Sequence, residues 1–110
     1  MTPVEVTIPL KLVSTANQRE HWAVRANRAR IHRFACMVVP LHRLPCVVTI
    51  TRIGPTPLDT DNLAISAKNV RDGIADRLGA NDNSPLIEWQ YAQEKCKRGE
   101  YGVRIRIEPA

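Results

Sequence analysis

The segment DNLAISAKNVRDGIADRLG, residues 61–79, decides the fold of this 110-residue chain. Its apolar side chains recur every three or four residues, which is the spacing of one face of a helix. At about 100° per residue these side chains fall within an arc of roughly 80°. They are Leu63, Ala67, Val70, Ile74 and Leu78. Gly79 follows directly and is typical of the residue that ends a helix. We therefore predict a helix from Asp61 to Leu78 with one face on a core.

The segments around this helix have the alternating apolar pattern of strands. Four segments show it, at about residues 4–10, 47–53, 87–92 and 101–108. A second helical pattern runs from about Gln18 to Val39, between the first two strands. Residues 97–100, with the sequence KRGE, resemble the turn of a hairpin between the last two strands. The predicted class is α+β: one domain over residues 1–110, with a small mixed sheet of about four strands (β-α-β-α-β-β) and two helices on one face.

The composition, 44% hydrophobic and 25% charged, is ordinary for a soluble globular protein. The longest apolar run, residues 34–41, is far shorter than the roughly 20 residues that a bilayer requires. We expect no membrane contact and no secretory signal. The three cysteines form no CxxC pair, which favours a reducing cytoplasm. Without a Walker loop or a GxGxxG turn, we also expect no nucleotide cofactor.

Charge is distributed unevenly along the chain, whose net charge is +5. Residues 1–53 carry eight basic and two acidic side chains, whereas residues 54–110 carry eight basic and nine acidic ones. A basic half joined to a half with most of the acids is typical of a polyanion-binding protein with a separate acidic site. The alternative is a basic protein whose charges serve only to keep it soluble.

The first predicted helix carries most of the positive charge of the basic half. One stripe, within about 60° of arc, has the spacing i, i+4, i+7 and i+11. It consists of His21, Arg25, Arg28 and His32, and the arginines Arg19, Arg30 and Arg33 lie elsewhere around the helix. Beside it runs an apolar stripe of Val24, Ile31, Ala35 and Val38. We predict that the basic residues contact DNA phosphates, with a merely solvated basic face as the alternative. The large aromatic residues Trp22, Trp89, Tyr91 and Tyr101 are expected to fill the core.

Three aspartates are candidates for binding a metal ion. Asp59 and Asp61 lie at the start of the second helix, where only one carboxylate is needed as a cap. Asp82 follows in the next turn segment. Two carboxylates about 4 Å apart repel by roughly 4 kcal/mol at an effective dielectric near 20, so a convergent set requires a bridging cation. Oxygen ligands alone favour Mg²⁺ or Mn²⁺. Lys68 and Asp72 share a helix side with Asp61, an arrangement that an ordinary exposed face also produces.

The acidic segment resembles the RusA family of Holliday junction resolvases. The resemblance lies in LDTDNL at residues 58–63, KNVRDGI at residues 68–74 and Asn81-Asp82, and is best over residues 55–95. The family pattern is Asp-x-Asp-Asn-Leu, a helical lysine with an aspartate four residues later, and an acidic pair in the following loop. This chain departs from it twice: Lys68 follows Asp61 by seven residues instead of four, and Asn81 replaces one acid.

This resemblance implies a small, dimeric, magnesium-dependent endonuclease of the kind found in phages and prophages. It implies that Asp59, Asp61 and Asp82 bind Mg²⁺ (or Mn²⁺) and that Lys68 is the catalytic lysine, with Asp72 either orienting Lys68 or joining the metal ligands. The expected function is resolution of four-way DNA junctions by paired nicks, with the whole chain as one RusA-like domain. Two alternatives remain open. One is a non-cleaving DNA-binding protein on the same scaffold, and the other a metal-dependent phosphodiesterase without junction selectivity.

Overall fold

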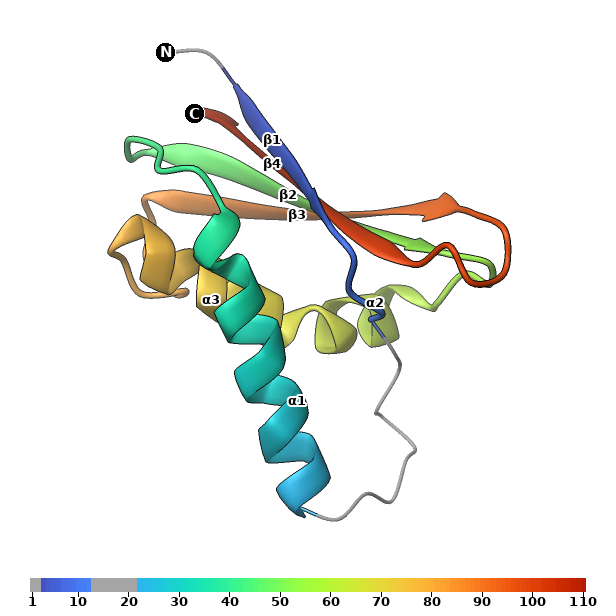
Figure 1. Ribbon diagram of the computed structural model, residues 1–110. Helices are drawn as coiled ribbons and strands as arrows, with labels where there is room; N and C mark the ends of the chain where they lie inside the picture. Colours follow the sequence, from blue (N-terminus) through green and yellow to red (C-terminus); the bar gives the residue numbers. More distant parts are fainter. Residues whose placement is uncertain (1–2, 13–21) are drawn as a thin grey trace.

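The computed structural model describes residues 3–12 and 22–110, and its α+β architecture confirms the predicted class (Figure 1). The strands are β1 (Val4–Ile8), β2 (Cys46–Gly54), β3 (Ile87–Lys95) and β4 (Gly102–Pro109). The helices are α1 (Trp22–Ala35), which continues into the 3₁₀ turn η1 (Cys36–Val38), α2 (Thr60–Ser66) and α3 (Lys68–Leu78). Within the described residues, none of these helices is both long enough and apolar enough to cross a bilayer.

The four strands form one mixed sheet in the order β1-β4-β2-β3. β4 is antiparallel to both β1 and β2, whereas β3 is parallel to β2. The predicted hairpin at residues 97–100 is therefore wrong, because β2 lies between β3 and β4. The physical reason is the helical crossover from β2, which returns the chain parallel to β2 on one side and leaves the other side to β4.

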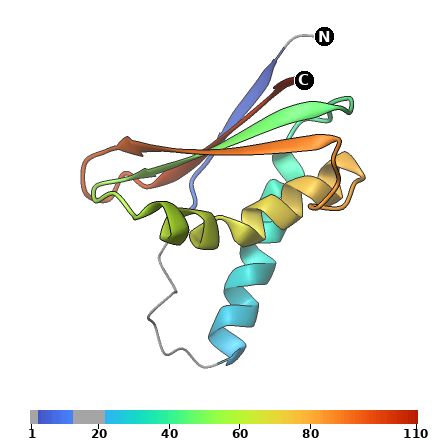
Figure 2. The ribbon, with the colours of Figure 1, turned by 180° about the vertical axis from the view of Figure 1, so that it is seen from behind.

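All the helices lie on one side of the sheet, and α1 extends away from it, as the view from behind also shows (Figures 1 and 2). Inward residues of β2 and β4 alternate along each strand and are fully buried; they include Val48, Ile50, Val103, Ile105 and Ile107. The predicted helix stripe meets them: Ala67, Val70 and Ile74 are fully buried, Leu63 is 5% exposed and Leu78 is partly buried. The other face of the sheet carries ion pairs among Glu5, Glu94, Arg104, Arg106 and Glu108.

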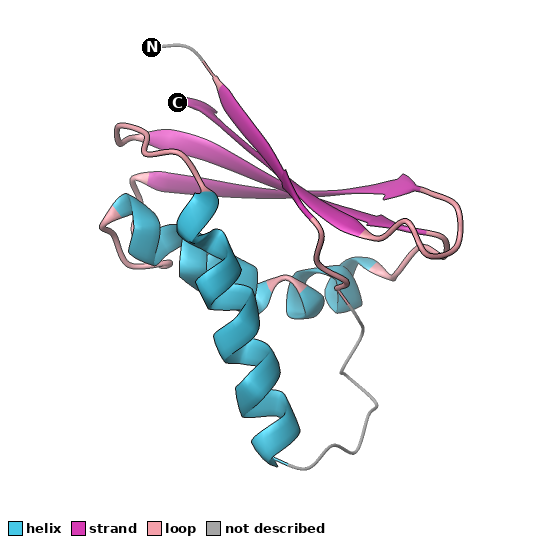
Figure 3. Ribbon diagram, in the orientation of Figure 1, coloured by secondary structure: helices cyan, strands magenta, loops and turns pink. Residues whose placement is uncertain are grey.

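Three predictions about the helices and the core need correction (Figure 3). The helix predicted over residues 61–78 is two helices, which separate at Ala67, although Gly79 does end α3 in the left-handed conformation. The described part of the first helix ends at Ala35, and its predicted residues 18–21 lie outside the described residues. Trp22 is 73% exposed and does not fill the core.

The other three aromatic residues are only partly buried. Trp89 and Tyr91 pack against the edge of the core, while the Tyr101 ring lies 4.4 Å from the Lys11 ammonium. Aliphatic side chains of the sheet and α3 fill the space instead, because strands that face a helical layer bury alternate β-branched residues efficiently. The core is therefore aliphatic, with aromatic rings at its margin.

Candidate functional site

The loop before α2 is held on two sides, and it fixes the position of Asp59 and Asp61. The buried Arg52 side chain donates from Nη1 to the Thr56 carbonyl oxygen (2.8 Å). The Gln93 amide donates to the Leu58 carbonyl (2.9 Å) and accepts from the Leu58 backbone N–H (2.7 Å). These contacts tie the loop to β2 and β3 immediately before the acidic pair.

Asp59 and Asp61 present exposed carboxylates at the start of α2. Asp59 occupies the N-cap position, and its backbone carbonyl accepts from the Leu63 N–H at 2.8 Å. Its side chain makes no capping hydrogen bond, so the predicted cap position is confirmed but the carboxylate is not used as a cap. Two carboxylates thus stand where a restrained loop enters the first turn of α2, and a hard cation could bind their oxygens there.

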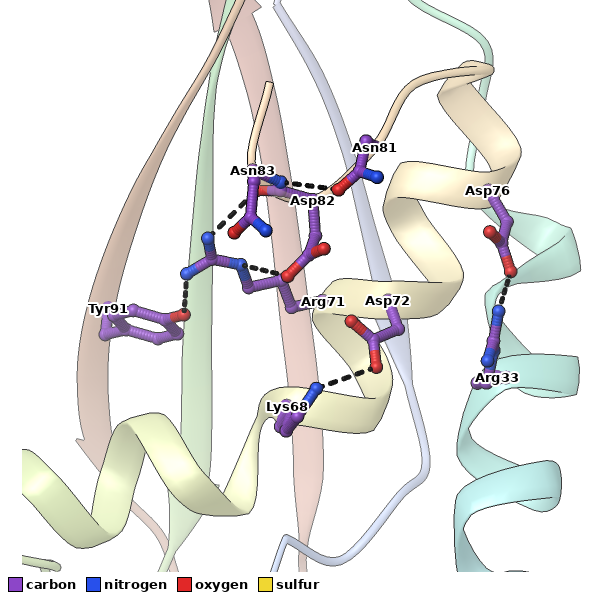
Figure 4. Close-up of polar contacts among 9 residues, drawn as sticks. All are labelled: Arg33, Lys68, Arg71, Asp72, Asp76, Asn81, Asp82, Asn83 and Tyr91. Carbon is purple, nitrogen blue, oxygen red and sulfur yellow. Dashed lines mark hydrogen bonds and ion pairs between the residues drawn. The ribbon is translucent and has the colours of Figure 1, made fainter. Parts of the chain in front are cut away.

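Asp82 lies at the tip of the segment after α3, where Arg71 holds it (Figure 4). The Arg71 Nη2 donates to the Asp82 carbonyl oxygen (2.9 Å), and its Nε lies 3.6 Å from the Asp82 carboxylate. The same guanidinium donates to the Tyr91 hydroxyl (3.1 Å) and lies 4.8 Å from the Trp89 ring centre. The Trp89 indole N–H also donates to the Asp82 carbonyl (3.0 Å). The loop tip is therefore fastened to both α3 and β3.

Lys68, Asp72 and Asp82 line a polar cavity of about 310 Å³ on the α3 side of the molecule. Within α3, Lys68 Nζ lies 3.2 Å from a carboxylate oxygen of Asp72, one helical turn away. Arg33 of α1 reaches the same cavity and pairs with Asp76 of α3 (Figure 4). The arrangement places two cations, Arg33 and Lys68, and the carboxylates of Asp72, Asp76 and Asp82 in one solvent-accessible cavity, with no excess of positive charge.

The predicted metal ligands are divided between two places. Asp59 and Asp61 do not line the cavity that contains Asp82. Among residues 3–12 and 22–110, no group of three or more histidine, cysteine, aspartate or glutamate side chains is close enough to hold a metal ion. The structure thus brings Lys68, Asp72 and Asp82 together but leaves the pair at the start of α2 apart from them.

The predicted DNA-contacting residues have different surroundings. Arg19 and His21 lie outside the described residues. Arg25 and Arg30 are exposed on α1, and Arg25 and Arg28 together line a cavity of about 300 Å³ between α1 and the α2–α3 layer. Arg33 is engaged by Asp76. The exposed part of the predicted basic surface is therefore carried mainly by arginines.

His32 does not belong to the exposed stripe, which corrects its predicted role as a phosphate contact. His32 is 5% exposed and lies on the side of α1 that packs against the protein. The apolar stripe predicted a different side of this helix as the buried one. Val24, Ile31 and Val38 of that stripe are instead about half exposed or more. Burial and the neighbouring Arg28 both lower the pKa of His32 below its ordinary value of 6.5.

We expect the free energy of unfolding to decrease as the pH falls below 6.5. His32 stays neutral in the folded chain, whereas the unfolded chain binds a proton there near pH 6.5, so acidification favours unfolding. Urea unfolding at several pH values between 7.5 and 5 should show this decrease, and the His32→Leu variant should show a smaller one. An identical pH dependence in both proteins would contradict the assignment.

Arg71 is a site residue that the sequence did not reveal. Its partners Asp82 and Tyr91 are eleven and twenty residues away, and only the folded course of the loop brings them together. The one available signal was its position beside Asp72 within the KNVRDGI segment.

Replacing Arg71 with methionine should loosen the segment that carries Asp82. The variant keeps much of the aliphatic contact with Trp89 but loses the donors to the Asp82 carbonyl and the Tyr91 hydroxyl. We expect roughly tenfold faster amide hydrogen exchange at residues 82–84, from about 1–2 kcal/mol of lost local stability. The Arg77→Met variant is a matched control, since Arg77 donates to the Val39 carbonyl at a different point on α3. Equal exchange in wild-type and Arg71→Met protein would show that Arg71 does not fasten the loop.

No protein-family model matches this sequence, and no curated protein matches it either. The resemblance to the RusA family therefore depends on the quoted motif residues alone.

Proposed function

We propose that the chain is a metal-dependent endonuclease that acts on branched DNA as a homodimer. The observation that carries the proposal is the exposed Asp59–Asp61 pair at the start of α2, which follows a restrained loop and belongs to the same helical layer as Lys68 and Asp72. The order of these residues, with Asp82 after them, follows the RusA-like pattern. A cytoplasmic location is part of the proposal and is supported by the sequence, since the three cysteines form no CxxC pair. Burial raises the pKa of the Cys36 thiol to about 11.

The carboxylates at the start of α2 fit a hard divalent cation such as Mg²⁺, with Mn²⁺ as a substitute. Their donors are all oxygens, and neither carboxylate is buried. When bound, the ion supplies a Lewis acid that polarises the scissile phosphate. Asp82 lies apart from this pair, and its carboxylate is 3.6 Å from Arg71 Nε. It would complete the set only if the loop that carries it moved toward the start of α2 and its carboxylate exchanged Arg71 for the cation.

The remaining site residues would act on the substrate and on one another. The Lys68 ammonium would offset charge on the phosphate, and Asp72, 3.2 Å from it, would orient it. Arg71 would position Asp82 through the loop backbone. Arg25, Arg28 and Arg30 would hold the DNA backbone without reading bases.

A second function, DNA binding without cleavage, is favoured by one observation. The Arg71–Asp82 ion pair neutralises one of the three predicted metal ligands in place of a cation. The displaced position of Lys68 relative to the family pattern points the same way. In this case the basic surface of α1 would bind DNA, and the aspartates would hold no catalytic metal ion.

Binding to DNA should weaken steeply as salt increases. If the exposed arginines of α1 neutralise three phosphates on each subunit, log K should fall by roughly 0.9 per phosphate for each decade of salt. Fluorescence anisotropy with a labelled four-way junction between low and moderate salt measures this slope. Arg30→Gln should reduce it, whereas an affinity that does not change with salt would exclude a phosphate-binding role for α1.

A cleavage assay distinguishes the candidates. Purified protein is incubated with a synthetic four-way junction and with a linear duplex, each with and without Mg²⁺. Mg²⁺-dependent nicking of the junction alone agrees with the proposal. Binding without nicking favours the second function, and equal cleavage of both substrates indicates a phosphodiesterase without junction selectivity.

A further inference from the structure

Arg52 is the one buried arginine or lysine among residues 3–12 and 22–110. It lies near the end of β2 on the face that the helices cover, and it is 7% exposed. Its Nε donates to the Leu12 carbonyl (3.1 Å) and its Nη1 to the Thr56 carbonyl (2.8 Å). No aspartate or glutamate of the described residues forms an ion pair with it. This lack of an anionic partner is unusual, because a charge that is removed from water needs a counter-charge.

The Arg52 guanidinium lines a cavity of about 290 Å³ at the ends of β2 and β3. Gly54, Pro57 and residues 93–95 also line it, and we call it the β2–β3 cavity. Within the described part of the chain, Arg52 Nη2 forms no hydrogen bond, and it is not among the unpartnered polar atoms that are fully enclosed. Nη2 is therefore accessible to solvent and available as a donor to a ligand in this cavity.

Gly54 leaves room for the guanidinium. A Cβ atom added at this position would lie 2.8 Å from Arg52 Nη1 and 3.0 Å from Arg52 Nη2. Contacts this close would force the guanidinium to move, so a larger residue at position 54 would displace it. The absence of a side chain at Gly54 thus allows Arg52 to occupy the wall of the cavity.

The β2–β3 cavity carries an excess of positive charge. Lys95, which pairs with Gly54 across the two strands, is exposed and forms no ion pair with any described residue. Glu94 is the one carboxylate in the lining, and it pairs with Arg104 at 2.7 Å on the other face of the sheet. Arg52 and Lys95 are therefore left without a counter-charge. The polar cavity beside α3 differs, since its carboxylates outnumber its cations.

We propose that the β2–β3 cavity binds a terminal phosphate group through Arg52 and Lys95. A planar guanidinium presents donors that match the oxygens of a phosphate, and a lysine adds a point charge. A terminal phosphate carries nearly two negative charges at neutral pH, which suits two cations. The volume of the cavity is at the lower limit for ligand sites, as a small anion requires.

This site goes beyond the DNA contacts proposed for α1. None of the residues that line it belongs to α1, and a terminal phosphate differs from the bridging phosphates of a DNA backbone. Its source is either free phosphate or the phosphorylated end of a nucleic-acid strand. Both present the same chemistry to Arg52 and Lys95.

Two-dimensional ¹H–¹⁵N NMR of the full chain, titrated with sodium phosphate at constant ionic strength, tests the inference. We expect saturable shifts of the Gly54 and Lys95 amides, with a dissociation constant on the order of 1 mM. Lys95→Gln should raise this constant at least about threefold, and Arg52→Met should remove saturation. Lys95 is exposed, so its variant tests the site even if Arg52→Met fails to fold.

Lys97→Gln is the matched control, because Lys97 is also exposed, lies two residues further along and does not line the cavity. It should leave the dissociation constant unchanged. The inference is overturned if the Gly54 and Lys95 amides of the wild type show no saturable shift. An equal dissociation constant in the wild type and in Lys95→Gln overturns it as well.

Two short single strands of the same sequence, with and without a 5′-phosphate, identify the source of the phosphate. If only the phosphorylated strand shifts the Gly54 and Lys95 amides, the site takes a strand end. If inorganic phosphate shifts them and neither strand does, the ligand is free phosphate. Equal shifts with both strands would contradict a terminal phosphate. None of these measurements uses Mg²⁺ or cleavage, so their outcome is separate from that of the junction assay.

Discussion

Replacing Asp61 with asparagine should reduce Mg²⁺-dependent cleavage of a four-way junction by roughly a hundredfold or more. The change removes one charged oxygen donor at the start of α2 and preserves the size and the helical position of the side chain. A metal ion that polarises a phosphoryl oxygen contributes several kcal/mol to transition-state stabilisation, and each 1.4 kcal/mol corresponds to a factor of ten in rate. The measurement is the single-turnover nicking rate at saturating protein.

Binding of the junction should change much less than cleavage. Asp61 is not among the α1 residues proposed to hold the phosphates, and its removal relieves repulsion with the DNA. Junction affinity in the absence of metal should therefore remain equal or increase. Glu88→Gln is the matched control, because Glu88 is an exposed carboxylate on β3, away from α2. Wild-type cleavage by Asp61→Asn would exclude the metal assignment, and loss of cleavage in Glu88→Gln would show a nonspecific charge effect.

The layered fold could be predicted because its apolar pattern is local. The stripe from Leu63 to Leu78 and the alternation in β2 and β4 identify the buried faces without knowledge of the partners. Gly79 ends α3 for a reason that also acts locally, since a left-handed φ of 73° is easily adopted only by glycine. The interruption at Ala67 could not be seen, because alanine favours helices and the apolar period continues through it.

The strand order could not be predicted from turn chemistry. Residues 97–100 do form a turn, with a hydrogen bond from the Glu100 N–H to the Lys97 carbonyl and a positive φ at Gly99. After this turn β4 nevertheless pairs with β2 on the side opposite β3, instead of pairing with β3. A short polar turn specifies a change of direction, whereas the neighbour of β3 is decided by the helical crossover from β2.

The candidate site shows the same division between local and distant information. Local signals identify part of the site. The place of residues 59 and 61 at a helix start marks the two acids, and the helical spacing of four residues pairs Lys68 with Asp72. The partner of Asp82 was not predicted. Its carboxylate faces Arg71 because the loop after α3 folds back over that helix. The spacing of residues in the sequence does not indicate the path of a loop. His32 was misplaced because α1 buries a side poorer in apolar residues than the side it exposes.

The second large effect is expected at Gly73, where α1 and α3 cross. A Cβ atom added there would lie 3.0 Å from the Arg33 Cα, the Arg33 carbonyl oxygen and the Cys36 Cβ. Two of these are backbone atoms, so α1 as a whole would have to move. Alanine favours a helix interior over glycine by about 1 kcal/mol, while overpacking typically costs about 1–3 kcal/mol. We expect Gly73→Ala to lower the free energy of unfolding by up to about 2 kcal/mol, measured by urea denaturation.

Gly102→Ala provides the matched control for this crossing. Its added Cβ would meet its nearest neighbours, the Ile53 Cδ1 and the Ile8 carbonyl oxygen, at 3.5 Å, which is an ordinary van der Waals contact. It should therefore destabilise the protein less than Gly73→Ala. Because the Arg33–Asp76 ion pair joins the same two helices, a displaced α1 should also weaken that pair. A Gly73→Ala protein as stable as the wild type would show that α1 can move away from α3 at little cost in free energy. The arginines of α1 would then not be held in fixed positions relative to the polar cavity that Lys68, Asp72 and Asp82 line.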